Sequence, residues 1–235
     1  TSVTTPIDLA AGFQKLVLAA DADVTVTLEA GFSTSRALVL GGRGTVVNHA
    51  AIDLVGTAVS DLDYSFGSSA WFRNEGSITA TLRPDIYESG ITLNNNNFAN
   101  SGLVTVYGGT GVSMSYNDVN NSGTITATGT GVNLFDGVLT NSGTIVSTGG
   151  VGVDLYGNVG YTGSNSGTIR GATFGAVIGV YFTNSGTISS AGTGAQVSPY
   201  GFLINAAGGV VSGGTGAAVT AYGFNAGVAN AGVIN

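Results

Sequence analysis

The acidic residues of this sequence are the clearest candidates for catalysis or cation binding. Asp61 and Asp63 lie two positions apart in a long stretch that breaks an otherwise regular pattern, and Asp85 and Glu88 form a second close pair. Two carboxyl groups that flank a glycosidic bond can cleave it, and carboxylates can also hold the Ca²⁺ of a polysaccharide lyase. Asp61 and Asp63 are therefore the candidate catalytic residues. The simpler interpretation is a solvated loop, because loops are rich in Asp.

Other groups that catalysis or metal binding requires are scarce. The chain has no cysteine, and His49 is its single histidine, so neither a thiolate nucleophile nor a histidine-rich metal site can form. We expect Asp136 and Asp154 to lie in turns and on outer strand faces, where they keep the protein soluble. The sequence therefore predicts no metal site and no cofactor.

Aromatic residues recur at similar places along the chain and are the candidate ligand-binding residues. They are Tyr116, Phe135, Tyr156, Tyr181, Tyr200 and Tyr222. Two interpretations are open: the rings pack inside or at one corner of a repeated structure, or they form an exposed ridge that stacks on sugars. We favour packing, because a tyrosine suits a half-buried corner with its hydroxyl group in water.

An asparagine repeat sets the positions of all these residues. The pentapeptide NSGTI begins at Asn121, Asn141, Asn165 and Asn184. Related segments extend the series from Asn48 to Asn230 at intervals of 19 to 26 residues, which is typical of a solenoid with coils of unequal length. We expect the Asn side chains to stack from coil to coil as a ladder. The predicted ladder comprises Asn74, Asn100, Asn121, Asn141, Asn165, Asn184, Asn205 and Asn230.

Apolar residues keep step with the asparagines. One column stands four residues after the Asn, and a second alternates with polar residues, which indicates strands with one face in the core. The predicted core includes Ile78, Val104, Ile125, Ile145, Ile169, Ile188, Val132, Leu134, Val153 and Leu155. These columns predict an all-β fold, a single-stranded parallel β-helix of about nine to ten coils with three short strands in each coil.

The repeat also suggests how the chain is divided. Residues 1–45 lack the full pattern, and we expect them to form an N-terminal cap and the first rung or rungs, since an open solenoid end exposes core and unpaired strand edges. Residues 46–235 carry the β-helix repeats. The last repeat has only begun at Asn235, so we expect the solenoid to continue in a parent protein.

Charge and hydropathy exclude two classes of partner. The net charge is −7, and all acidic residues lie between Asp8 and Asp154. No basic stripe exists that could neutralise phosphates, so we expect no nucleic-acid binding. The apolar runs are too short to span a bilayer, so direct membrane insertion is not expected.

The repeats resemble the β-helical passenger regions of type V autotransporters and related haemagglutinin-like surface adhesins of Gram-negative bacteria. The resemblance covers roughly residues 48–235 and is carried by the NSGTI segments, joined to Gly131-Val132-Asn133-Leu134 and Gly152-Val153-Asp154-Leu155. It implies that the chain is a passenger fragment, located at the bacterial cell surface or outside the cell.

These observations lead to one main functional hypothesis and two alternatives. The main hypothesis is a non-enzymatic extracellular β-solenoid, a surface-displayed stalk or adhesion module whose partner is a host or bacterial surface glycan or protein. The first alternative is a carbohydrate-active β-helix, either polysaccharide-binding or a lyase or hydrolase, acting through the loops between Ile52 and Phe72 and between Ile78 and Ile91. The second is a fibre subunit that assembles with itself through the open β-helix end.

Overall fold

The computed structural model is an all-β protein built as a parallel β-solenoid of about nine turns. It describes residues 2–3, 15–20, 24–32, 34, 36–61, 70–83, 88–94, 96–158, 160–214 and 219–235. The described residues contain no helix, and every strand pairing among them is parallel. The predicted fold class is confirmed. No helix in the described ranges is long and apolar enough to cross a membrane.

Three sheets make up the solenoid, and we name them A, B and C. The described strands of sheet A, in spatial order, are β1 (Ser2–Val3), β3 (Thr25–Leu28), β5 (Thr45–Asn48), β8 (Ala70–Asn74), β11 (Asn96–Asn100), β14 (Val119–Asn121), β17 (Leu139–Asn141), β20 (Thr162–Asn165), β23 (Tyr181–Asn184), β26 (Phe202–Asn205) and β29 (Gly227–Asn230). The strands of sheet B are β2 (Lys15–Ala20), β4 (Ala37–Gly42), β7 (Val59–Asp61), β10 (Ser89–Leu93), β13 (Thr110–Ser115), β16 (Val132–Phe135), β19 (Val151–Tyr156), β22 (Phe174–Ile178), β25 (Thr193–Val197) and β28 (Val219–Ala221). The strands of sheet C are β6 (Ala51–Val55), β9 (Ser77–Thr81), β12 (Leu103–Tyr107), β15 (Thr124–Ala127), β18 (Thr144–Ser147), β21 (Thr168–Gly171), β24 (Thr187–Ser190), β27 (Val210–Gly213) and β30 (Val233–Ile234).

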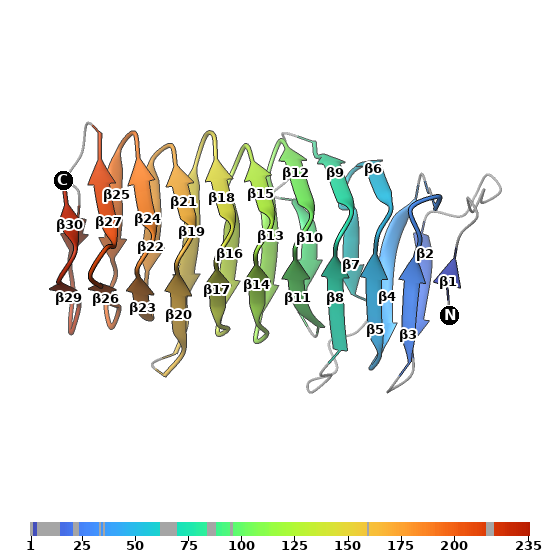
Figure 1. The fold of residues 1–235 in the computed structure, drawn as a ribbon, viewed down its shortest axis with the longest axis horizontal. Coiled ribbons are helices and arrows are strands. Elements are labelled where there is room, and N and C mark those ends of the chain that lie inside the picture. The colour runs from blue at the N-terminus through green and yellow to red at the C-terminus, as the bar shows by residue number, and fades with distance from the viewer. Residues whose placement is uncertain are drawn as a thin grey trace.

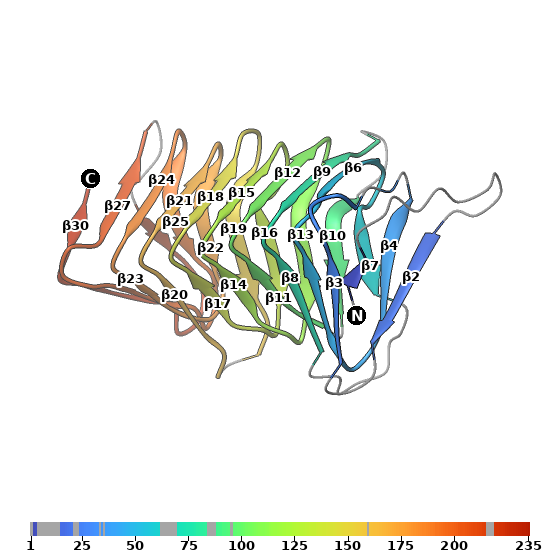
Figure 2. The ribbon, with the colours of Figure 1, turned by 45° about the vertical axis from the view of Figure 1, so that its right-hand side comes forward.

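The sheets run side by side along the length of the molecule. From β5 onward the chain passes in each coil through sheet A, then C, then B, and returns to sheet A one step further along (Figure 1). Figure 2 shows the coils one behind another, each bending at the corners between the sheets. Side chains on the outer face of a central strand therefore have neighbours at the same position in the coils before and after it.

The turn between sheets A and C explains the repeated pentapeptide. Asn121 ends β14, and Thr124 begins β15. Between them, the amides of Ser122 and Gly123 both donate to the carbonyl of Asn100, at 2.8 and 3.0 Å. A Cβ atom at Gly123 would lie 2.2 Å from the carbonyl oxygen of Gly102, so only glycine fits this close approach of backbones.

The interior of the solenoid is one continuous apolar core. Strand residues alternate between core and surface, as in β15, where Ile125 is buried and Thr124 is partly exposed. Ile78, Val104, Ile125, Ile145, Ile169, Ile188, Val132, Leu134, Val153 and Leu155 are all buried in it. Aromatic rings also stack within it, with the ring centroids of Phe72 and Phe98 5.8 Å apart.

The asparagines that end the strands of sheet A form a hydrogen-bonded ladder. Each side-chain Nδ2 donates to Oδ1 of the next Asn at 2.7–2.8 Å. The members are Asn48, Asn74, Asn100, Asn121, Asn141, Asn165, Asn184, Asn205 and Asn230. All but Asn230 are buried, so this polar column lies inside the fold with its hydrogen bonds made.

Strands from the first 45 residues continue two of the sheets. β2 pairs with β4 over six residues in sheet B, and β3 pairs with β5 in sheet A. In the described part of the chain, sheet C begins only at β6. Leu28 occupies the ladder position opposite Asn48, so the ladder does not extend to β3.

Candidate functional site

A groove on the outer face of sheet A is the candidate functional site. It is an open depression of about 420 Å³ over strands β8, β11, β14 and β17. Its lining residues are Trp71, Arg73, Glu75, Ala99, Asn100, Ser101, Asn120, Asn121, Ser122, Thr140 and Ser142. Asn100 and Asn121 belong to the buried Asn ladder, so part of this ladder lies directly beneath the groove.

The groove arises from a change in side-chain size between neighbouring coils. On β8 the outward residues Trp71 and Arg73 are large. The residue paired with Arg73 on the next strand, β11, is the much smaller Ala99. Farther along the sheet the exposed lining residues are short and polar, among them Asn120 and Thr140. Strand β8 therefore forms a raised wall beside a lower, hydrophilic floor.

The wall carries a cation that stacks on an aromatic ring. The guanidinium carbon of Arg73 lies 5.8 Å from the ring centroid of Trp71, a cation–π distance. Arg73 is exposed, and no carboxylate in the described part of the chain lies within ion-pair distance of it. The guanidinium therefore keeps its fork of N–H donors available at the edge of the groove.

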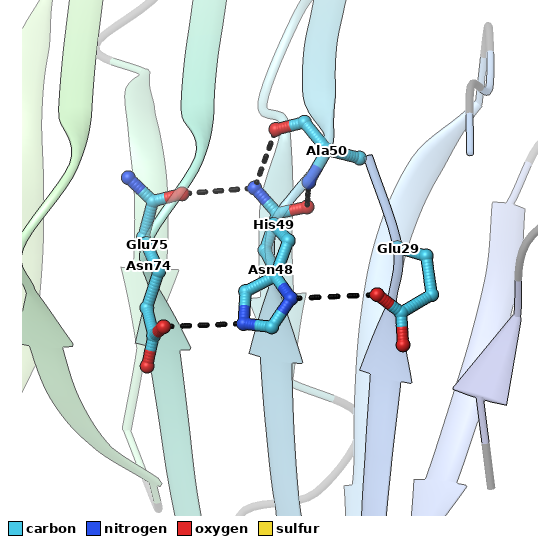
Figure 3. A network of polar contacts seen from close by, with 6 residues as sticks. All are labelled: Glu29, Asn48, His49, Ala50, Asn74 and Glu75. Atoms are coloured by element: carbon cyan, nitrogen blue, oxygen red, sulfur yellow. Dashed lines mark hydrogen bonds and ion pairs between the residues drawn. The ribbon is translucent and has the colours of Figure 1, made fainter. Parts of the chain in front are cut away.

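Next to this wall, a histidine joins three successive coils. His49 Nε2 lies 3.1 Å from Glu75 Oε2, and His49 Nδ1 lies 3.6 Å from Glu29 Oε2 (Figure 3). All three side chains are well exposed, whereas Asn48 beside them is buried and holds Asn74. Glu75 lines the groove with a carboxylate that is already bound to the imidazole.

The Glu29–His49–Glu75 arrangement has no partner groups for nucleophilic or metal chemistry. Both imidazole nitrogens face carboxylates, and no group of three His, Cys, Asp or Glu side chains among the described residues could hold a metal ion. The arrangement is therefore a surface bridge between coils. Exposed ion pairs of this kind contribute roughly 0–1 kcal/mol each to stability.

Of the two catalytic candidates, Asp61 lies in the described part of the chain. Asp61 ends β7, and its Oδ2 accepts hydrogen bonds from the backbone amide of Asn94 at 2.8 Å and from Asn96 Nδ2 at 3.3 Å. It is thus part of a strand and ties neighbouring coils together, contrary to the expectation of a solvated loop. Asp63 lies outside the described residues.

The expectation that Asp136 is a solubilising surface group is wrong. Asp136 is only 2% exposed and has a left-handed backbone conformation, with φ of 50°. Its carboxylate accepts hydrogen bonds from the backbone amide and the Nδ2 of Asn158 in the next coil. Asp136 therefore closes a turn, because Asp tolerates this conformation and can accept several donors at once.

Asp154 lies on the outer face of sheet B, where it is partly shielded from solvent. Burial raises the pKa of the Asp154 carboxyl above its ordinary value. Burial also raises the pKa of the nearby Tyr156 hydroxyl, and the Asp154 charge adds to that increase, while a hydrogen bond with Asn133 opposes it. Sheet B thus carries a carboxylate whose charged form is disfavoured by its surroundings.

The aromatic candidates lie on the outside of the solenoid and not in its interior. Tyr116, Tyr156, Tyr181, Tyr200 and Tyr222 are 44–54% exposed, and Phe135 is partly buried. Phe135 contacts two of them, with ring centroids 5.4 Å from Tyr116 and 5.3 Å from Tyr156. Tyr181 instead starts β23 and stacks on Phe202 at 5.6 Å. Four of the candidates therefore belong to two small aromatic clusters, Tyr116–Phe135–Tyr156 and Tyr181–Phe202, and the six do not form one continuous ridge in these ring contacts.

Comparisons with known proteins identify no relative of this chain. No protein-family model, curated protein or solved structure matches the chain. The parallel β-solenoid is the feature that the chain shares with β-helical passenger regions.

Sequence reasoning missed the groove, although the asparagine register contains the signal for it. Aligning Asn74 with Asn100 places Trp71 opposite Asn97, three residues before each asparagine. The same alignment places Arg73 opposite Ala99, one residue before each, and the structure has both pairs in this register. It also missed the Glu29–His49 contact, because Leu28 replaces the asparagine that would have brought Glu29 into the same alignment.

Proposed function

We propose that this chain is a non-enzymatic adhesion module displayed at the cell surface or outside the cell. In this proposal the solenoid is the rigid stalk, and the groove on sheet A is the surface that contacts a partner. The observation that carries the proposal is the groove itself, which combines an aromatic ring, exposed hydroxyl groups and a guanidinium that forms no ion pair with any described residue, all on one outer face.

The construction of the solenoid supports a role as a stalk. From β5 onward successive coils pair through three sheets, and the internal Asn ladder adds a hydrogen bond at each step from Asn48 to Asn230. Buried hydrogen-bond networks in which every member has a partner make a structure rigid. A rigid, elongated body can hold a binding surface at a distance from the membrane to which it is attached.

The state of Asp61 supports a binding role over an enzymatic one. A general acid or nucleophile needs a carboxyl group that can reach a substrate. The Asp61 carboxylate is hydrogen-bonded to the backbone and side chain of residues in the following coil. Removal of the Asp61 carboxylate should therefore weaken the contact between these two coils, and we expect no loss of a catalytic activity.

An adhesion assay tests the proposal. Beads coated with the chain should adhere to surfaces covered with glycans or cells, and the Trp71→Ala/Arg73→Gln double variant should reduce adhesion by roughly tenfold or more. Arg170→Gln on β21 of sheet C is the control, because it removes one exposed arginine far from the groove. Equal adhesion of beads bearing the chain and uncoated beads, or glycan cleavage by the purified chain, would overturn the proposal.

A further inference from the structure

We propose that the groove on sheet A recognises an acidic saccharide, a sugar chain bearing a carboxylate or a sulfate ester, and that Arg73 binds the anionic group. This inference rests on the proposed function, because it names the class of partner for the same site. It follows from three properties of the groove: its shape, its polar floor and the free cation on its wall.

The shape and the floor favour a saccharide over a protein. The groove is open and its floor carries Asn120, Ser122, Thr140 and Ser142, all exposed and polar. A stable protein interface normally has an apolar, desolvated centre, which these residues do not supply. Hydroxyl and carboxamide groups in rows instead match the many hydroxyl groups of a sugar.

The spacing of the floor residues favours an extended chain of sugars. Neighbouring strands lie ~4.8 Å apart, so equivalent side chains repeat at about that interval along the solenoid. One pyranose unit of an extended polysaccharide has a similar length. Ser101, Ser122 and Ser142 each follow a ladder asparagine on successive coils, so their hydroxyl oxygens recur at regular steps. The Ser122 hydroxyl also donates to the carbonyl of Asn100 at 3.3 Å, which leaves its oxygen to accept a hydrogen bond from a sugar.

Arg73 makes the groove selective for an anion. Its guanidinium stacks on Trp71 and forms no ion pair with the described residues, so the cation needs no rearrangement before it binds. Guanidinium can donate two parallel hydrogen bonds to the oxygens of one acidic group. Trp71 is here a positioning residue, because it holds the Arg73 side chain over its ring.

The two carboxylates near the groove do not neutralise Arg73. Glu75 is the nearer one in sequence, and its Oε2 contacts His49 Nε2. Glu29 contacts the other imidazole nitrogen of the same histidine. The net charge of −7 opposes the approach of an anion at long range, but at physiological ionic strength charges more than ~8 Å apart are largely screened. Contact with Arg73 therefore decides binding.

Three matched ligands test the inference: glucuronate oligosaccharides, the same oligosaccharides after reduction of their carboxyl groups, and the reduced oligosaccharides bearing sulfate esters. Calorimetry should show binding of the first or the third and at least roughly tenfold weaker binding of the second. A preference between the first and third tells which acidic group the site takes. Equal binding of all three, or binding of none, overturns the inference.

Variants identify the residue responsible. Arg73→Gln should weaken binding roughly 10- to 100-fold, and Arg73→Lys should restore only part of it, because lysine keeps the charge and lacks the planar fork. Arg170→Gln lowers the net charge equally and should leave affinity unchanged. Unchanged affinity of Arg73→Gln would contradict the assignment.

The same measurements separate this inference from the proposed function. If beads coated with the chain still adhere through the groove while acidic and neutral oligosaccharides bind equally, the chain is an adhesion module with a different ligand. If coated beads do not adhere at all, the proposed function fails with the inference.

Discussion

At the scale of single residues, the ladder asparagines combine several roles in one small side chain. Asn141 accepts from Asn121 Nδ2 and donates to Asn165 Oδ1, both at 2.7 Å, and its Nδ2 also lies 3.3 Å from the carbonyls of Gly143 and Thr168. It is 1% exposed, so no water can replace these partners. The carboxamide thus links three coils and also holds the turn that follows its own strand.

Asn141→Ala should therefore destabilise the protein markedly. The substitution leaves Asn165 Oδ1 without its ladder donor in the interior, and one such buried unsatisfied group costs roughly 1–3 kcal/mol. We expect a lower midpoint in denaturant unfolding, corresponding to about 2–4 kcal/mol once the other lost hydrogen bonds are included. Asn120→Ala, at the exposed neighbouring position on β14, is the control and should change stability by less than about 0.5 kcal/mol. Similar losses in the two variants would contradict the structural role of the ladder.

Asp154 gives a pH-dependent prediction. Burial raises its pKa in the folded protein above the unfolded value, so the folded state binds more protons between these two pKa values. Stability should therefore decrease as pH rises through this range and should not recover at higher pH. Asp154→Asn removes the charge, so it should raise the melting temperature at neutral pH and have little effect below the ordinary pKa of Asp.

Thermal unfolding at several pH values checks this prediction. Asp53→Asn serves as the control, because Asp53 is exposed on β6, and it should change the melting temperature little at any of these pH values. A lower melting temperature of Asp154→Asn at neutral pH would mean that the Asp154 charge stabilises the fold.

At the scale of strands and turns, the contacts between coils depend on glycines that allow backbones to approach. A Cβ at Gly143 would lie 2.1 Å from the carbonyl oxygen of Gly123 and 2.6 Å from the carbonyl carbon of Ser122. Neither backbone atom can move without shifting a neighbouring coil. The same clash occurs at the equivalent glycine of each NSGTI segment, so the turn geometry is set by stacking as well as by local conformation.

Gly143→Ala should consequently destabilise the protein by about 1–3 kcal/mol or more, as expected for forced overpacking. Gly179 is the matched comparison, because a Cβ there would come no closer than 3.1 Å to a backbone oxygen. Gly179→Ala should cost clearly less in the same urea titration. An equal effect of both substitutions would show that the turn can relax around the added methyl group.

The sequence predicted the repeated elements and not the groove, for a physical reason. Core residues such as Ile125 and Ile145 recur because they fill equivalent sites, so the pattern predicts strands, register and the Asn column directly. A groove arises where equivalent outer positions differ, as between Arg73 and Ala99. The asparagine register aligns these two positions, but a search for what recurs from coil to coil does not select the positions that differ. Asp136 was misjudged for a related reason, since its burial depends on Asn158 in the next coil and not on its own neighbours in sequence.

At the scale of the whole molecule, stability should vary along the solenoid axis. Among the described strands of the 235-residue chain, β15 and β18 of sheet C have a paired strand on both sides, whereas β30 pairs with β27 alone, and its Val233 and Ile234 are exposed. In repeat proteins each unit is stabilised mainly by contacts with its neighbours. A coil with a partner on one side only should open more readily than a central coil.

Hydrogen exchange on the 235-residue chain measures this gradient. Paired amides of β15 and β18 should exchange at least roughly tenfold more slowly than those of β30, because local opening in the centre must break contacts on both sides. Uniform exchange along the axis would indicate that all coils unfold as one unit.

The Asn ladder also gives the protein an electrical direction. Every side-chain hydrogen bond in it runs the same way, from Nδ2 of one coil to Oδ1 of the next, from Asn48 through to Asn230. The carboxamide dipoles therefore add along the axis, as peptide dipoles do in an α-helix, and polarise one another within the apolar interior. A further coil stacked on the end in the same orientation would place an Asn Oδ1 against an Asn Nδ2 and extend this macrodipole. A coil stacked in the opposite orientation would place two donors or two acceptors against each other.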